Sequence, residues 1–228
     1  MIEVKYIYDE TTPPKEIVFG ACRDLALFLA DKGYKFFKSK MEITKKINDF
    51  EFSVSFYTYS SNAKGRRARI SVNCRIKNIK YNELYYANNL GYIADIGWNE
   101  WELYGKDNYE KSIKEIIYHL ENRFLPLCDR FINDIKSLVL DVVNHGFYPN
   151  HSRIRYETSV DFLLRYGDVK LLEKSIQNYY DKLIPTRRRL FRTHLLCVKN
   201  GEELHPMDTE KTMFDAIIKY NLNINMER

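Results

Sequence analysis

The sequence predicts an α+β fold: an N-terminal helix, an antiparallel β-meander of four or five strands packed by helices, and an all-α C-terminal part. Two observations predict it. Between residues 34 and 80 apolar and polar side chains alternate, which is the period of half-buried strands. From Asn108 onward apolar side chains recur every three or four residues, which is the period of amphipathic helices. A run of strands followed by a run of helices is typical of the α+β class.

Length and composition indicate a folded protein with one large domain or two small ones. The chain has 228 residues, a formal net charge of +5, 45% hydrophobic and 29% charged residues, which is a globular composition. The N-terminal residues do not resemble a signal peptide, and no run of about 18 apolar residues predicts a membrane span. The four cysteines lie far apart in the sequence, so we expect a reducing, cytoplasmic location.

The first helix is marked at both ends. Thr12 before Pro13 and Pro14 predicts a helix start with Thr12 as the capping residue, because proline is well tolerated in the first turn. Gly33 stands where a glycine commonly follows a helix end. We therefore expect a helix over residues 13–32.

Period-two patterns predict the strands that follow. They cover residues 34–40, 42–47, 50–59 and 68–77, with a further candidate strand over 88–96. The two longer strands are expected to pair as a hairpin. A register that places Glu51 opposite Lys77 and Tyr59 opposite Arg69 keeps both apolar rows on one face of the sheet.

Helices are expected over the rest of the chain. They cover residues 108–124, 127–142, 158–166, 168–183, 187–199 and 208–221. Pro126 is expected to break or kink the path between the first two, because proline lacks the backbone N–H. The irregular stretch from Phe147 to Tyr156 is the best boundary candidate. We expect an α+β domain over residues 1–147 and a helical extension or small bundle over 148–228.

Basic and aromatic side chains gather on and beside the outer face of the predicted hairpin. They are Tyr57, Tyr59, Arg66, Arg67, Arg69, Arg75 and Lys77. Such residues can bind an acidic protein surface, or they can stack bases and hold phosphates. The alternative is internal pairing: residues 61–80 hold seven basic side chains and no acid, whereas residues 81–110 hold six acids and Lys106 alone.

Two tryptophans, Trp98 and Trp101, lie close together after the predicted sheet. If exposed, they would anchor an interface, because tryptophan is enriched among the residues that dominate binding energy. The alternative is that they cover the edge of the sheet, since tryptophan is usually well buried.

A basic helix near the C-terminus carries Arg187, seven residues before His194. This spacing resembles the motif of HEPN-type ribonucleases, in which Arg would hold a phosphate and His would transfer a proton. The chain departs from that pattern at Leu190, and His194 falls in an apolar stripe, which favours a core histidine. His145 and His151 are too few to form a metal site. We therefore expect no metal and no cofactor.

The order of a helix, GYKFFKSK, alternating strands and YHLENRFLPLCDRF resembles the family called domain of unknown function 4304, over roughly residues 10–150. The matching positions are Gly33, Tyr34, Lys35, Phe36, Phe37, Leu125, Pro126, Leu127, Arg130 and Phe131. The resemblance implies a fold more than an activity. Such proteins look like bacterial accessory or defence-associated proteins, some comparable to toxin-immunity partners.

Common hydrolase and nucleotide-binding motifs are missing from the sequence. We therefore expect a non-catalytic intracellular protein–protein interaction module, with an acidic protein surface as partner and with the immunity or defence role that the resemblance implies. The alternative is a nucleic-acid-binding protein, in its extreme form a ribonuclease that uses Arg187 and His194. Neither hypothesis includes a membrane, and the oligomeric state is left open.

Overall fold

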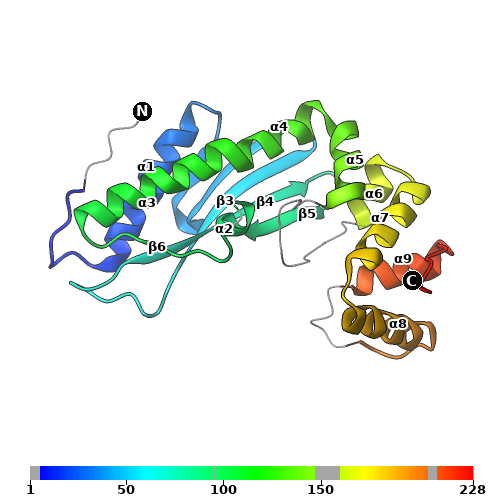
Figure 1. Ribbon diagram of the computed structural model, residues 1–228. Helices are drawn as coiled ribbons and strands as arrows, with labels where there is room; N and C mark the ends of the chain where they lie inside the picture. The colour runs from blue at the N-terminus through cyan, green and yellow to red at the C-terminus, as the bar shows by residue number, and fades with distance from the viewer. Residues whose placement is uncertain (1–5, 95, 147–159, 205–209, 228) are drawn as a thin grey trace. The chain divides into compact units, whose positions relative to one another are not determined.

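The chain forms two compact units, Met1–Ile132 and Asn133–Arg228. The computed structural model describes residues 6–94, 96–146, 160–204 and 210–227. Sheet and helices make up the first unit, and the regular elements described in the second are helices (Figure 1), which confirms the α+β class. The boundary expected at 147/148 lies outside the described residues. None of the helices within the described ranges is long and apolar enough to cross a membrane.

Helix α1 (Pro14–Ala30) buries the face that its apolar spacing predicts. The buried side chains are Ile17, Val18, Ala21, Cys22, Leu25 and Leu29. Gly33, with a φ of 83°, follows the helix as expected. The predicted cap is wrong: the N-cap is Pro13, which has no side-chain hydrogen bond. Thr12 instead donates its hydroxyl to the Asp9 carboxylate at 3.0 Å, so this hydroxyl is used in the preceding turn.

The sheet has six antiparallel strands. They are β1 (Lys35–Phe37), β2 (Glu42–Ile47), β3 (Phe50–Thr58), β4 (Arg69–Asn78), β5 (Glu83–Asn89) and β6 (Trp101–Glu102). The first five are neighbours in chain order, and β6 pairs with β4. Glu51 lies opposite Lys77, so the predicted hairpin register is confirmed. The apolar rows of β3 and β4 are buried on one face of the sheet, as that register requires.

Two segments differ from the expected strands. The stretch expected over 34–40 ends with β1 at Phe37, and the 3-10 helix η1 (Lys38–Lys40) follows. The candidate strand over 88–96 is confirmed only at its start, because β5 ends at Asn89 and helix α2 (Leu90–Ile93) begins. The Asn89 side chain caps that helix by accepting a hydrogen bond from the Gly91 N–H at 2.8 Å.

A long helical path follows the sheet (Figure 1). It consists of α3 (Lys106–His119), the π-helix η2 (Leu120–Phe124) and α4 (Leu125–Asn133). The helical path is not broken at Pro126, which lies in the first turn of α4; the alternative expectation of a kink stays a prediction. A π-helical turn stands just before this proline, and its wider hydrogen-bond pattern accommodates a residue without an N–H. The path ends instead at Asp134, where φ is −145°.

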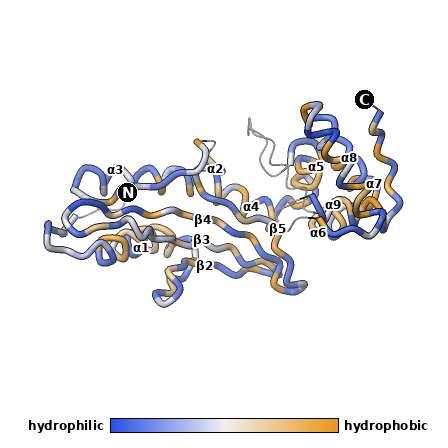
Figure 2. The backbone as a smooth tube through the Cα atoms, turned by 90° about the horizontal axis from the view of Figure 1, so that it is seen from below, coloured by the Kyte–Doolittle hydropathy of each residue, from blue (hydrophilic) through white to orange (hydrophobic). Residues whose placement is uncertain are grey.

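The second unit is entirely helical within the described residues. Its helices are α5 (Ile135–His145), α6 (Val160–Tyr166), α7 (Val169–Lys182), α8 (Pro185–Lys199) and α9 (Lys211–Lys219). Asp168 caps α7, as predicted, by accepting a hydrogen bond from the Leu171 N–H at 2.8 Å. The expected start of the last helix at Asp208 lies outside the described residues. Figure 2 shows that hydrophobic segments occur in these helices as well as in the strands of the first unit.

A tyrosine network fixes the N-terminal segment to α1. Tyr109 donates its hydroxyl to the Asp24 carboxylate at 2.9 Å, and the rings of Tyr8 and Tyr109 lie 5.8 Å apart. Tyr8 lies against Gly20 of the helix: a Cβ there would lie 1.5 Å from the Tyr8 hydroxyl, so a larger residue would displace the Tyr8 side chain. Burial raises the pKa of Asp24, and the Tyr109 hydrogen bond and the Arg23 charge oppose this shift.

The raised pKa of Asp24 predicts a pH-dependent loss of stability. The folded state binds a proton on Asp24 more tightly than the unfolded state does, and this tighter binding stabilises the fold. The stabilisation is fully present below the pKa of Asp24 in the unfolded chain and is lost as pH rises through its pKa in the folded protein. Asp24→Asn keeps an acceptor for Tyr109 but does not titrate. We expect the variant to gain unfolding free energy relative to wild type in urea titrations as pH rises above about 4, the ordinary pKa of an aspartate. If the difference in unfolding free energy between Asp24→Asn and wild type did not change with pH, the raised pKa of Asp24 would be contradicted.

Candidate functional site

Two arginines of the predicted hairpin surface are held by carboxylates of the same unit. Arg69 forms ion pairs with Glu100 and Glu102, each at 3.2 Å, and Arg75 pairs with Glu42. The hydrogen bonds that Arg69 donates to Glu102 and Glu100 raise its pKa. The basic block therefore meets the acidic block at Arg69, as the internal-pairing alternative predicts.

Arg69 is part of a clasp that fixes β6 to the start of β4. The Glu102 carboxylate also accepts hydrogen bonds from the backbone N–H groups of Ala68 and Tyr104, both at 3.0 Å. The Leu103 N–H donates to the Ala68 carbonyl at 2.6 Å. Because its charge is used within the fold, Arg69 is a structural residue, and reversing its charge would disturb the sheet.

The remaining strand residues of the surface have mixed exposure. Lys77 lies opposite Glu51 across the β3–β4 ladder. Tyr57 is 52% exposed. Tyr59, just after β3, is half-buried, and its hydroxyl is buried with no hydrogen-bond partner among the described residues.

Three exposed cations lie in the loop between β3 and β4. We call Lys64, Arg66 and Arg67 the basic loop; none of them forms an ion pair within the described part of the chain. The loop has a defined shape, because the Asn62 side chain accepts from the Arg69 N–H at 2.8 Å and donates to its carbonyl at 3.0 Å. Arg66 and Arg67 are thus held at the end of the hairpin with their charges open to solvent.

The two tryptophans have opposite environments. Trp101 lies in β6, pairs with Ile70 of β4 and is 2% exposed, so it covers the sheet edge and cannot contact a partner. Trp98 is 56% exposed. Its ring meets that of Tyr92 edge to face, with centroids 6.4 Å apart. Only Trp98 therefore remains in the candidate surface.

The segment 96–99, which we call the tryptophan loop, is anchored by hydrogen bonds to the Asn89 side chain. The Asn89 side chain, which is 1% exposed, accepts a hydrogen bond from the Asn99 N–H at 3.2 Å and donates to its carbonyl at 3.3 Å. The backbone approaches closely at the same place, since a Cβ on Gly91 would lie 2.2 Å from the Gly97 carbonyl oxygen. No local pattern predicts this anchoring, which joins residues ten positions apart in the sequence.

Arg187 and His194 lie on α8 in the second unit. Arg187 is exposed, whereas the His194 ring packs edge to face on Phe214 of α9, with centroids 6.4 Å apart. Two further arginines of α8 support neighbouring backbone: Arg188 donates to the Leu183 carbonyl at 2.9 Å, and Arg192 donates to the Met226 carbonyl at 2.9 Å. These contacts favour a packing role for the helix over the ribonuclease alternative.

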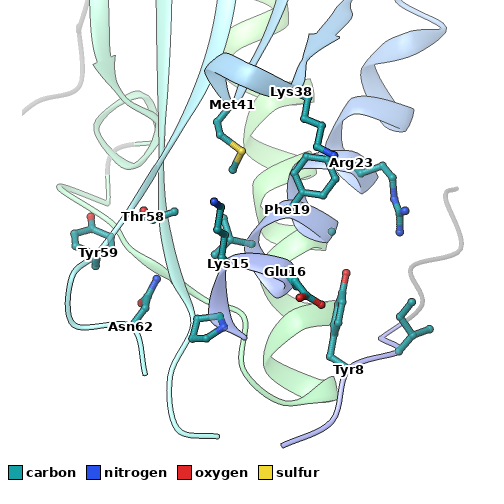
Figure 3. A pocket seen from close by; sticks show the side chains of 14 residues that line it. Tyr8, Lys15, Glu16, Phe19, Arg23, Lys38, Met41, Thr58, Tyr59 and Asn62 are labelled. Carbon is teal, nitrogen blue, oxygen red and sulfur yellow. The ribbon is translucent and has the colours of Figure 1, made fainter. Parts of the chain in front are cut away.

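The structure also contains a groove that sequence reasoning missed (Figure 3). It has a volume of about 960 Å³ and lies in the first unit, between α1, η1 and the end of β3. Its residues come from four separate segments, so no local pattern marks it. The described residues contain no group of three or more His, Cys, Asp or Glu side chains suited to a metal ion; His151 lies outside them.

Comparisons with known proteins leave the identity open: the chain matches no protein-family model, and no curated protein and no solved structure is significantly similar to it. The resemblance to the domain of unknown function 4304 family stays a prediction. The function proposed below is therefore inferred from the geometry of the described residues.

Proposed function

We propose that the protein is a non-catalytic binding module that binds an acidic surface of another protein through the tryptophan loop and the basic loop. The observation that carries the proposal is the exposure of Trp98, at 56%, on a backbone that the buried Asn89 holds in place. An aromatic side chain on a rigid support is a typical interface anchor, because little conformational entropy is lost when a partner covers it.

The two loops are connected through Arg69. Its guanidinium contacts Glu100, two residues after Trp98, and its backbone is bound by Asn62 beneath the basic loop. Since Arg69 is already neutralised, the uncompensated positive charge beside the clasp comes from the basic loop. This charge favours a partner that carries carboxylates around an apolar pocket for the indole.

The pairing of the hairpin charges also supports a protein partner over a nucleic acid. A phosphate chain along the hairpin would need Arg69 and Arg75, whose charges are taken up by carboxylates. The affinity of nucleic-acid binders depends on uncompensated cations along the path of the phosphate chain, and these two arginines are compensated.

Capture experiments with immobilised full-length protein test the proposal. Wild type should retain one stoichiometric protein from native lysate after nuclease treatment. Trp98→Ala should weaken that complex by about 10- to 30-fold. Arg66→Glu with Arg67→Glu should slow its association and reduce its salt dependence.

The matched control reverses two exposed charges of α8, with Arg189→Glu and Lys199→Glu combined, and should leave the complex unchanged. Equal retention by wild type, Trp98→Ala and the basic-loop variant would contradict the site. Loss of the captured material on nuclease treatment would favour the nucleic-acid alternative instead.

A further inference from the structure

The groove beside α1 is large enough for a small organic ligand. Its volume of about 960 Å³ lies within the range of roughly 300–1,000 Å³ that such sites occupy. Figure 3 shows Lys15 between two walls, with Thr58 on one side and Phe19 on the other. The groove lies within the first unit and uses neither the tryptophan loop nor the basic loop.

Positive charge dominates the groove. Lys15, Arg23 and Lys38 line it, and Glu16 is the one acid among the lining residues described. None of these four forms an ion pair within the described ranges. The Lys38 amine lies 4.6 Å over the Phe19 ring, which holds it at the wall. The groove therefore presents cations that form no ion pair within the described ranges, and their positive charge attracts an anion.

Tyr59 adds an aromatic wall to the groove. Its side chain is half-buried and lines the groove, so its ring offers a flat apolar surface to a ligand.

We propose that this groove binds a nucleoside phosphate. Lysine and arginine side chains are suited to hold phosphate oxygens, and a tyrosine ring can stack on a base. Of the groups on the walls, the Lys15, Lys38 and Arg23 cations would take the phosphates and Tyr59 would take the base. The proposal is independent of the proposed protein partner.

Calorimetric titration of the full chain tests it with three probes. ATP is the complete ligand, and adenosine and tripolyphosphate are its two halves. We expect ATP to bind at least about tenfold more tightly than either half, since both the cations and Tyr59 contribute. Absence of ATP binding at millimolar concentration overturns the proposal. Equal affinity for tripolyphosphate and ATP overturns it too, because charge alone would then explain the binding.

Variants locate the site. Lys15→Ala and Lys38→Ala should each weaken ATP binding about tenfold. Lys40→Ala should have no effect, because this exposed lysine of η1 does not line the groove. Glu16→Gln should tighten binding, which the loss of a merely structural residue would not do. Unchanged affinity in Lys15→Ala, Lys38→Ala and Glu16→Gln, with melting temperatures like wild type, would overturn the assignment.

Discussion

Phe191→Ala is expected to lower the unfolding free energy of the second unit by about 3–5 kcal/mol. The Phe191 side chain is fully buried. Its ring lies 6.0 Å from Tyr179, 5.5 Å from Tyr180 and 4.8 Å from Phe214, measured between centroids. It thus joins α7, α8 and α9, and the cavity left by alanine cannot be filled by one neighbour moving in.

The tryptophans allow this effect to be measured separately in each unit. Both lie in the first unit, so tryptophan fluorescence reports on that unit, whereas far-ultraviolet circular dichroism includes the helices of the second. In urea, Phe191→Ala should move the circular dichroism transition to lower concentration and leave the fluorescence transition in place. The control Leu196→Ala, at a position that is 59% exposed on the same helix, should cost less than about 0.5 kcal/mol. An equal shift of both signals would show that the two units unfold together.

Gly91→Ala is expected to disrupt the tryptophan loop at a cost of about 2–3 kcal/mol. The added Cβ would lie 2.2 Å from the Gly97 carbonyl oxygen and 2.7 Å from the Asn99 Cβ. The backbone oxygen cannot yield unless the loop itself moves. The hydrogen bonds between Asn89 and Asn99 would then be strained or lost, and Trp98 would lose its rigid base.

Hydrogen exchange over the peptide around Asn99 measures this opening, because the Asn99 N–H is donated to Asn89. We expect faster exchange in Gly91→Ala and weaker retention of the captured partner, although Trp98 itself is unchanged. Gly97→Ala is the matched control: its φ of 81° strains alanine, but a Cβ there meets no atom within 4 Å. Equal effects of the two substitutions would show that the close approach at Gly91 does not fix the loop.

The hairpin and the start of α7 could be predicted because their signals are periodic or local, whereas the cap predicted for α1 is wrong. The Glu51–Lys77 register follows from keeping two apolar rows on one face, and Asp168 caps α7 through its own side chain. Pro126 shows the limit of such rules. A proline predicts a break only if the surrounding hydrogen bonds are α-helical, and apolar spacing cannot reveal the π-helical turn that precedes it.

The candidate site was harder to predict, because its properties depend on residues distant in the sequence. Arg69 and Arg75 do lie on the expected strand, yet the carboxylates that neutralise them are 31 to 33 positions away. Trp98 and Trp101 are only three residues apart, and the short strand β6 buries one and leaves the other exposed. The groove joins four segments through tertiary packing alone.

The shortness of β1 has a consequence for self-association. This outermost strand has three residues, begins with the exposed Lys35 and passes directly into η1. An outer strand normally leaves a row of unpaired N–H and C=O groups to which another chain can add. In β1 this row of backbone groups is too short to hold a second sheet in register. The ammonium group of Lys35 would also repel Lys35 of a second copy of the chain. Strand addition at this border of the sheet is therefore disfavoured.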